Sequence, residues 1–287
     1  MNSLNIALLG DIHGKLPLAF KLVKRLEKER DIKINLVLQC GDAGIFPDIA
    51  KLDRASKSHS KRDPAELGFN KYFVNRNDPV FNKFIDSIDF KMICVRGNHE
   101  DHEFLDKLEK ETTDSIFPVD IYKKVYVLKT GHIFKFAKNN IEINIVGIGR
   151  IGVKGNRKES KYIQEYERKS LKELYKDKTQ IDILLTHDSP LDFVTPGFGL
   201  KEINEFLNLK QPVIQFHAHT GGYYNRKIFS NNITEIYKIA ELEWRRDYNL
   251  KDGSLVLLKW KDRNRNSIEV IKDKWFKEYN YYNWNEI

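Results

Sequence analysis

Three short apolar runs in the first hundred residues each end at a glycine that is followed by a potential metal ligand. The junctions are Ile6–Leu9 with Gly10-Asp11-Ile12-His13-Gly14, Leu36–Cys40 with Gly41-Asp42, and Met92–Val95 with Arg96-Gly97-Asn98-His99-Glu100. Such short, wholly apolar runs are typical of strands that are covered on both faces. Glycine lets the chain turn sharply after each strand, so a carboxylate, imidazole or amide group is presented at the strand end.

The segment between the first two runs predicts a helix. Pro17 suits a first helical turn, and Ala19, Leu22, Val23 and Leu26 recur at the spacing of one helix face. A strand, a helix and a strand in this order indicate a parallel crossover unit, and sheets of this kind bind ligands at the carboxyl ends of their strands. We therefore expect the three junctions to lie at one edge of a sheet.

A second β region follows. Val125–Leu128, Ile133–Phe136 and Ile141–Ile148 alternate with turn residues, and the strands around Asn139-Asn140 predict a hairpin. We expect this run to form a second, partly antiparallel sheet packed on the first. Two later buried strands, Ile181–Thr186 and Val213–Phe216, lead into further histidines at His187, His217 and His219.

The chain length of 287 residues fits one large α/β domain spanning 1–287. Residues 47–90 are polar and basic at first and helical at their end, which predicts an insertion over the site entrance. Residues 242–287 form a C-terminal part of strands and an aromatic, charged tail.

Composition sets the expected class of protein. The net charge of +8 permits a polyanionic partner such as nucleic acid, although a solvated lysine-rich surface explains it equally well. The two cysteines, Cys40 and Cys94, lie in apolar runs and are typical of reduced core thiols. With no leader pattern and no apolar stretch near the roughly 18 residues of a membrane span, we expect a cytoplasmic location and no membrane partner.

The residues expected at strand ends form a mixed donor set. They are Asp11, His13, Asp42, Asn98, His99, His187, His217 and His219. Imidazole and carboxylate together suit Mn, Fe, Zn or Co, and the absence of clustered cysteines argues against a structural zinc module.

In order and approximate spacing, these motifs resemble the calcineurin-like metallophosphoesterase superfamily from residue 6 to about 222. The resemblance implies a four-layer α/β/β/α sandwich of two mixed sheets flanked by helices, and a site with two divalent metal ions. It assigns Asp11, His13 and Asp42 to the first metal. In this assignment the second metal is held by Asn98, His187 and a late histidine, and Asp42 bridges the two metals. It makes His99 a proton donor to the leaving oxygen and Arg96 a phosphate-binding residue.

The late histidines depart from the family pattern Gly-His-x-His. In one register His217 and His219 are the pair, and Phe216 replaces the glycine. In the other, Ala218 replaces the glycine, His219 is the first histidine and Gly221 stands at the second. The second register is favoured, because relatives often carry a histidine before the glycine and a threonine after the first histidine.

The resulting hypothesis is a hydrolase that attacks a phosphodiester or phosphomonoester with metal-bound hydroxide. Two close cations lower the pKa of a shared water, a carboxylate such as Asp42 bridges them, and an imidazole titrating near neutrality such as His99 assists the leaving group. Alternatives are a phosphatase of a small nucleotide or phosphoprotein, and a non-catalytic module on the same fold that binds nucleic acid or protein.

Within the superfamily the pattern is nearest to the branch of RNA lariat debranching enzymes. Gly41-Asp42 lacks the Arg-Gly-Pro-type continuation of phosphoprotein phosphatases, and the insertion and the Gly-rich stretch Gly147–Lys158 are similar to that branch. Those enzymes typically carry cysteine at the position of Asp11, which argues against lariat chemistry itself.

Overall fold

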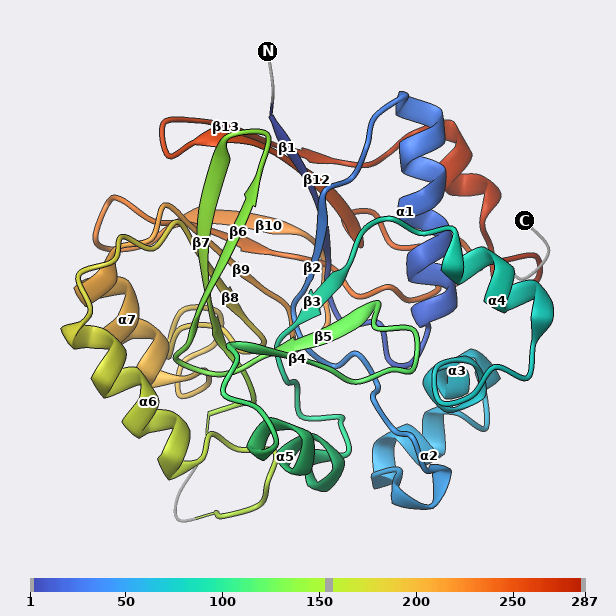
Figure 1. The fold of residues 1–287 in the computed structure, drawn as a ribbon, viewed down its shortest axis with the longest axis horizontal. Helices are drawn as coiled ribbons and strands as arrows, with labels where there is room; N and C mark the ends of the chain where they lie inside the picture. The colour runs from blue at the N-terminus through green and yellow to red at the C-terminus, as the bar shows by residue number, and fades with distance from the viewer. Residues whose placement is uncertain (1–2, 153–156, 285–287) are drawn as a thin grey trace.

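The computed structural model describes residues 3–152 and 157–284, and its two mixed β-sheets pack face to face with helices on both outer faces (Figure 1). The predicted four-layer α/β/β/α architecture is confirmed. Sheet A has the order β13-β12-β1-β2-β3-β5-β4 and sheet B the order β10-β11-β9-β8-β7-β6. The strands of sheet A are β1 Leu4–Leu9, β2 Leu36–Gln39, β3 Met92–Cys94, β4 Ile116–Pro118, β5 Val125–Leu128, β12 Leu255–Asp262 and β13 Arg265–Val270. Those of sheet B are β6 Ile133–Lys138, β7 Ile141–Ile148, β8 Ile183–Thr186, β9 Ile214–His217, β10 Asn225–Ile228 and β11 Glu235–Lys238.

The central strand β1 explains why its run is wholly apolar. Its side chains alternate between two cores: Ala7 and Leu9 join the core under the helices, whereas Ile6 and Leu8 join the core between the sheets. Both faces of the strand are therefore covered, as expected for parallel strands. β1, β2, β3 and β5 are parallel neighbours, so their carboxyl ends lie at one edge of sheet A.

The outer face of sheet A is covered by helices from the first half of the chain, on the right of Figure 1. The helices of this half are α1 Leu16–Arg30, α2 Arg54–His59, α3 Gly68–Tyr72, α4 Pro79–Asp86 and α5 His102–Lys110, with 3₁₀ segments at η1 Ile49–Lys51 and η2 Pro64–Leu67. Helix α1 buries the predicted stripe, including Leu22 and Leu26, and ends where Asp31 takes a left-handed conformation. A third 3₁₀ segment, η3 Lys274–Glu278, adds Trp275 and Phe276 to the same core.

The outer face of sheet B is covered by α6 Glu165–Lys176 and α7 Lys201–Lys210, at the left of Figure 1. Leu171 of α6 and Phe206 of α7 pack on outward-facing residues of the sheet such as Val146. Since β7, β8 and β9 are parallel, their carboxyl ends also share one edge.

One expectation about the second β region is wrong. Val125–Leu128 is strand β5 of sheet A, where it pairs with β3 in parallel, and only β6 and β7 of the expected run belong to sheet B. The periodicity of a segment identifies a strand but not the strand that it pairs with. After β3 the chain passes through α5 and returns to pair with β3, so β5 stays in sheet A. The hairpin at Asn139-Asn140 is confirmed, with both residues at positive φ.

The segment 47–90 holds η1, α2, η2, α3 and α4, and α4 is the helix expected at its end. Residues 153–156, within the Gly-rich stretch Gly147–Lys158, lie outside the described residues. Among the helices that the structure describes, none is long and apolar enough to cross a membrane.

Candidate metal centre

The predicted ligands come from strand ends of both sheets. Sheet A contributes Asp11 and His13 after β1, Asp42 after β2, and Asn98 and His99 after β3. Sheet B contributes His187, which directly follows β8, and His219, two residues after β9. The centre therefore lies where the carboxyl edges of the two sheets meet.

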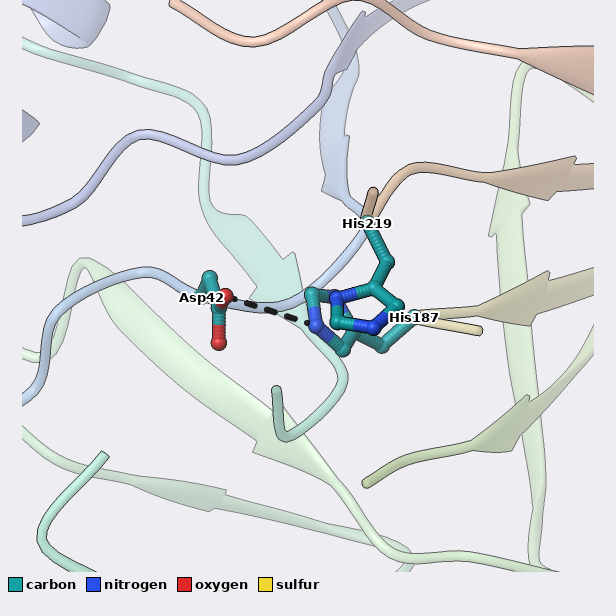
Figure 2. Close-up of side chains that lie close together, drawn as sticks. All are labelled: Asp42, His187 and His219. Carbon is teal, nitrogen blue, oxygen red and sulfur yellow. Dashed lines mark ion pairs between the residues drawn. The ribbon is translucent and has the colours of Figure 1, made fainter. Parts of the chain in front are cut away.

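Two groups of potential ligands share one carboxylate. Asp11, His13 and Asp42 form the first group, and Asp42, His187 and His219 the second, with the donor atoms of each group within 4.8 Å of one another. Figure 2 shows the second group, in which His187 Nε2 lies 3.4 Å from Asp42 Oδ2. The amide oxygen of Asn98 lies 3.0 Å from the same nitrogen, so it adjoins this second group.

The backbone is adapted to bring these side chains together. At Gly97 a Cβ would overlap Asp42 Oδ1, and at Gly41 a Cβ would lie 2.7 Å from the His187 ring. His13, Asp42 and His219 all have positive φ, at 42°, 52° and 54°. Non-glycine residues adopt this conformation at a cost, and such strain concentrates at functional sites.

Electrostatics make Asp42 and His187 a buried ion pair. Burial opposes ionisation of Asp42, but His187 holds the pKa of this carboxyl well below its usual range. Burial likewise opposes the His187 cation, yet Asp42 and Asp11 raise the pKa of His187 to about 10. The carboxylates of Asp42 and Asp11 thus favour a positive charge beside them, which can be a proton on His187 or a bound cation that replaces this proton.

The other donors fit divalent cations. Burial lowers the pKa of His13, and lowers that of His219 to about 3, so both imidazoles are neutral, as metal binding requires. Burial, with a contribution from Asp42, raises the pKa of Asp11 to about 7, and a cation beside it would favour its charged form. Buried carboxylates, neutral imidazoles and an amide oxygen are a donor set suited to first-row metals.

His99 lies beside the two groups and is held by a residue that sequence reasoning missed. Its backbone N–H donates to Asp42 Oδ1 at 2.7 Å, and its Nδ1 lies 2.8 Å from Asp53 Oδ2. Burial opposes protonation, but the hydrogen bond to Asp53 and the charge of Asp42 raise the pKa of His99. Although burial acts the other way, His99 lowers the pKa of Asp53 to about 2. Asp53 is also the N-cap of α2. An aspartate before a short helix is a capping signal in the sequence, but it does not indicate a contact with His99.

Two buried side chains brace the ligand loops from behind. The Gln39 amide donates to the carbonyls of Gly10 and Gly41, at 2.8 and 2.5 Å, and so ties the loops after β1 and β2 together. Glu100 accepts from the backbone N–H groups of Ala43 and Ile45 at 2.9 and 2.7 Å. These contacts fix the loop that carries the shared carboxylate.

Two predicted site residues lie outside the cluster. His217 is buried, belongs to neither donor group and lines a separate cavity with Tyr223 and Lys238. Of the two late histidines, His219 is the one that lies in a donor group. Arg96 is buried with its guanidinium paired to Asp106 at 2.5 Å and to Glu109, so it is directed to α5 and is not offered to a phosphate.

Comparison with known proteins gives a family and a fold. Residues 4–223 match the family described as calcineurin-like phosphoesterase. The chain is similar to the protein TT1561 of Thermus thermophilus, with a TM-score of 0.53 and 14% identity over 94% of this chain and 99% of that chain. At this identity the likeness concerns the fold alone.

Two further solved structures have TM-scores below 0.5. A 5′-nucleotidase from Candida albicans SC5314 has a TM-score of 0.49 and 14% identity, over 96% of this chain and 55% of that one. A novel phosphatase from Mycoplasma pneumoniae has a TM-score of 0.45 and 13% identity, over 99% of both chains. No curated protein matches the chain.

Proposed function

The chain belongs to the calcineurin-like phosphoesterase family, whose sequence pattern covers residues 4–223, and we propose that it hydrolyses a phosphate ester with two divalent metal ions. The observation that carries this proposal is the pair of donor groups that share Asp42. A side chain common to two adjacent ligand sets is what a dinuclear centre needs. Mn, Fe, Zn and Co all suit these donors.

The proposed ligands divide into one set for each metal. Asp11 and His13 would hold one metal, and Asn98, His187 and His219 the other, with Asp42 between them. When bound, such a pair of ions lowers the pKa of a water and neutralises phosphoryl oxygens. The absence of a histidine at Gly221 leaves the first metal with fewer protein ligands than in relatives that keep the full pattern.

His99 is the proposed proton donor to the leaving oxygen. Its Nδ1 is occupied by Asp53 at 2.8 Å, which leaves Nε2 for the substrate. The raised pKa keeps more of the imidazole protonated near neutral pH, the form required of a general acid. The backbone N–H of His99 donates a hydrogen bond to Asp42 Oδ1, so His99 lies next to the shared carboxylate.

The decisive experiment combines activity with metal content. Wild-type protein with Mn²⁺ is assayed on bis-p-nitrophenyl phosphate and p-nitrophenyl phosphate, and bound metal is measured by mass spectrometry. Asp42→Asn is expected to abolish activity and metal loading together. His99→Ala is expected to lower kcat by about 10²–10⁴-fold with metal retained, the range of general acid catalysis.

Asp78→Asn is the matched control, since Asp78 is the N-cap of α4 and belongs to neither donor group. Monoester turnover alone would favour the phosphatase alternative. No turnover with Mn²⁺, or with Fe, Zn or Co in its place, would favour a binding module on the same fold. Loss of metal in His99→Ala, or its retention in Asp42→Asn, would reverse the assigned roles. Nearness to the lariat debranching branch stays a proposal that rests on motif order.

A further inference from the structure

The loop after β9 lacks a side chain where the Gly-His-x-His pattern has its last histidine. In the register that takes His219 as the first late histidine, Gly221 stands at the second. The donor group proposed for the first metal then consists of Asp11, His13 and Asp42 alone. Because first-row metal ions bind about four to six ligands, either water or a further side chain must complete this set.

The carboxyl group of Glu241 lies beside the position that lacks the histidine. A Cβ at Gly221 would lie 3.3 Å from Glu241 Oε1 and 4.0 Å from the carboxyl carbon. Apart from the chain neighbours of Gly221, no other residue that the structure describes has an atom within 4 Å of this Cβ. A side chain at position 221 would therefore contact the Glu241 carboxylate from its first carbon onward.

The backbone around Glu241 is fixed against two of the ligand segments. Glu241 lies in the connection from β11 to β12. On one side of it, the Ile239 N–H donates to the His217 carbonyl at 2.8 Å. On the other side, the Leu242 N–H donates to the Asp11 carbonyl at 2.7 Å. These two hydrogen bonds hold the Glu241 segment between the end of β9 and the loop after β1.

The charge of Glu241 acts on residues assigned to the first metal. Burial is the largest cause that raises the pKa of Asp11, and the charges of Asp42 and Glu241 add to it. Burial lowers the pKa of His13, whereas Asp42 and Glu241 act in the opposite direction. Glu241 is therefore within electrostatic range of the first donor group, although it is not one of the residues in that group. Carboxylates gathered in this way favour a cation between them.

A lysine holds one oxygen of Glu241 and leaves the other toward Gly221. Lys251 Nζ lies 2.7 Å from Glu241 Oε2, whereas Oε1 is the atom next to Gly221. The Glu241 side chain is 21% exposed, so it is neither locked in the core nor free in solvent. Carboxylates that bind a metal are commonly hydrogen-bonded to a second protein group, which orients them. The contact with Lys251 has this character.

Resting on the proposed function, we propose that Glu241 is a ligand of the first metal and takes the place of the histidine that is missing at Gly221. The first metal would then be held by three carboxylates, from Asp11, Asp42 and Glu241, and by the imidazole of His13. Carboxylate ligands suit Mn²⁺ better than imidazole ligands do, so Mn²⁺ is the probe for the test.

The test measures Mn²⁺ binding to the full chain by titration calorimetry and electron paramagnetic resonance. Wild-type protein is expected to bind two ions whose spins couple, because the ions share Asp42. Glu241→Gln removes the charge with little change in size. It should weaken binding of one ion by at least about tenfold, since even the partners of metal ligands change affinity by about 10–100-fold. At a Mn²⁺ concentration that fills only the tighter site, its spectrum should be that of a single uncoupled ion.

Glu235→Gln is the matched control. Glu235 is a partly exposed glutamate of β11 that pairs with Arg226 at 2.5 Å, as Glu241 pairs with Lys251, and it lies outside both donor groups. This variant should bind both ions as tightly as the wild type and keep the coupled spectrum. Thermal melting of the metal-free variants verifies that each is folded.

Three outcomes would contradict the proposal. If Glu241→Gln binds both ions as tightly as Glu235→Gln does, Glu241 serves only its ion pair with Lys251, and the proposed function still stands. If Glu241→Gln loses both ions, Glu241 supports the centre as a whole and is not a ligand of the first metal. If wild-type protein binds fewer than two Mn²⁺ ions, the proposed two-metal centre fails and this inference fails with it.

Discussion

At the scale of single residues, the centre depends on close approaches that only glycine permits. Gly97 makes room for the Asp42 carboxylate and Gly41 for the His187 ring. Asp42 in turn has a positive φ of 52°, a conformation that costs free energy unless neighbouring contacts hold it. The buried Glu100 carboxylate supplies such contacts, because it accepts hydrogen bonds from two backbone N–H groups of the same loop. Packing and hydrogen bonding therefore offset the strain that places the shared ligand.

The pairing of Asp53 with His99 leads to a prediction about pH. Asp53→Asn should lower kcat by roughly 10–100-fold, because the imidazolium loses its carboxylate partner. Since Asp53 helps raise the pKa of His99, its loss should lower that pKa. In the role proposed for His99 the imidazolium is the active form, so activity in the variant should decline at lower pH than in the wild type. The measurement is the pH profile of kcat/KM with metal content recorded in parallel.

Asparagine can still cap α2, so this substitution removes the charge of Asp53 without removing its role at the start of the helix. Asp48→Asn is the matched control, an exposed N-cap in the same insertion. An unchanged basic limb of the profile in Asp53→Asn would show that Asp53 does not act on the proton of His99.

At the scale of elements, the sequence predicted those that carry their own pattern. The apolar runs of β1, β2, β3 and β8 and the amphipathic face of α1 were readable because burial on both faces, or on one helix face, leaves a local period. The three Gly-ligand junctions likewise placed Asp11, Asp42 and Asn98 at strand ends. Short edge strands such as β4 and β10 lack such a period, and β10 is exposed throughout.

Contacts between distant segments were not predictable. The hydrogen bond of His99 to Asp53 spans 46 residues, and the link from Gln39 to Gly10 spans 29. No periodicity encodes either pair. Arg96 shows the same limit. Its place before Gly97 predicts a contact with phosphate, whereas the structure pairs it with Asp106 and Glu109 of α5, and only the fold defines these contacts.

Lys15 joins three elements and gives a prediction for stability. Its fully buried ammonium lies 3.4 Å from Asp63, 3.6 Å from Glu66 and 3.3 Å from Glu243. Lys15→Met should lower the free energy of unfolding by about 3–5 kcal/mol, because three carboxylates would lose their common cation. Urea unfolding followed by circular dichroism measures the change.

Lys33→Met is the control, since Lys33 pairs with Asp89 at 3.7 Å on the surface, with both side chains more than 70% exposed. Such pairs contribute well under about 1 kcal/mol. A Lys15→Met loss as small as that of Lys33→Met would mean that the three elements are held by apolar packing alone.

At the scale of the whole molecule, the candidate centre joins the two halves of the sandwich. Sheet A supplies Asp11, His13, Asp42 and Asn98, and sheet B supplies His187 and His219. Two contacts among the described residues cross this edge: His187 pairs with Asp42, and the backbone N–H of His219 donates a hydrogen bond to the Asp11 carboxylate. Metal ions bound here would connect the sheets at the edge where the loops, not the strands, meet.

Metal binding should therefore stabilise both sheets together. At a free Mn²⁺ concentration of about 100 times Kd, binding to the native state adds roughly 2.7 kcal/mol, which raises the melting temperature by several degrees. Hydrogen exchange should slow at the carboxyl ends of β1 and β2 in sheet A and of β8 and β9 in sheet B, because the ligand loops of both are held by the same ions. Asp42→Asn should lose the temperature shift and the added protection, whereas Asp78→Asn should keep both. Protection confined to the sheet-A loops would contradict a centre shared by the two sheets, since His187 and His219 would then take no part in binding.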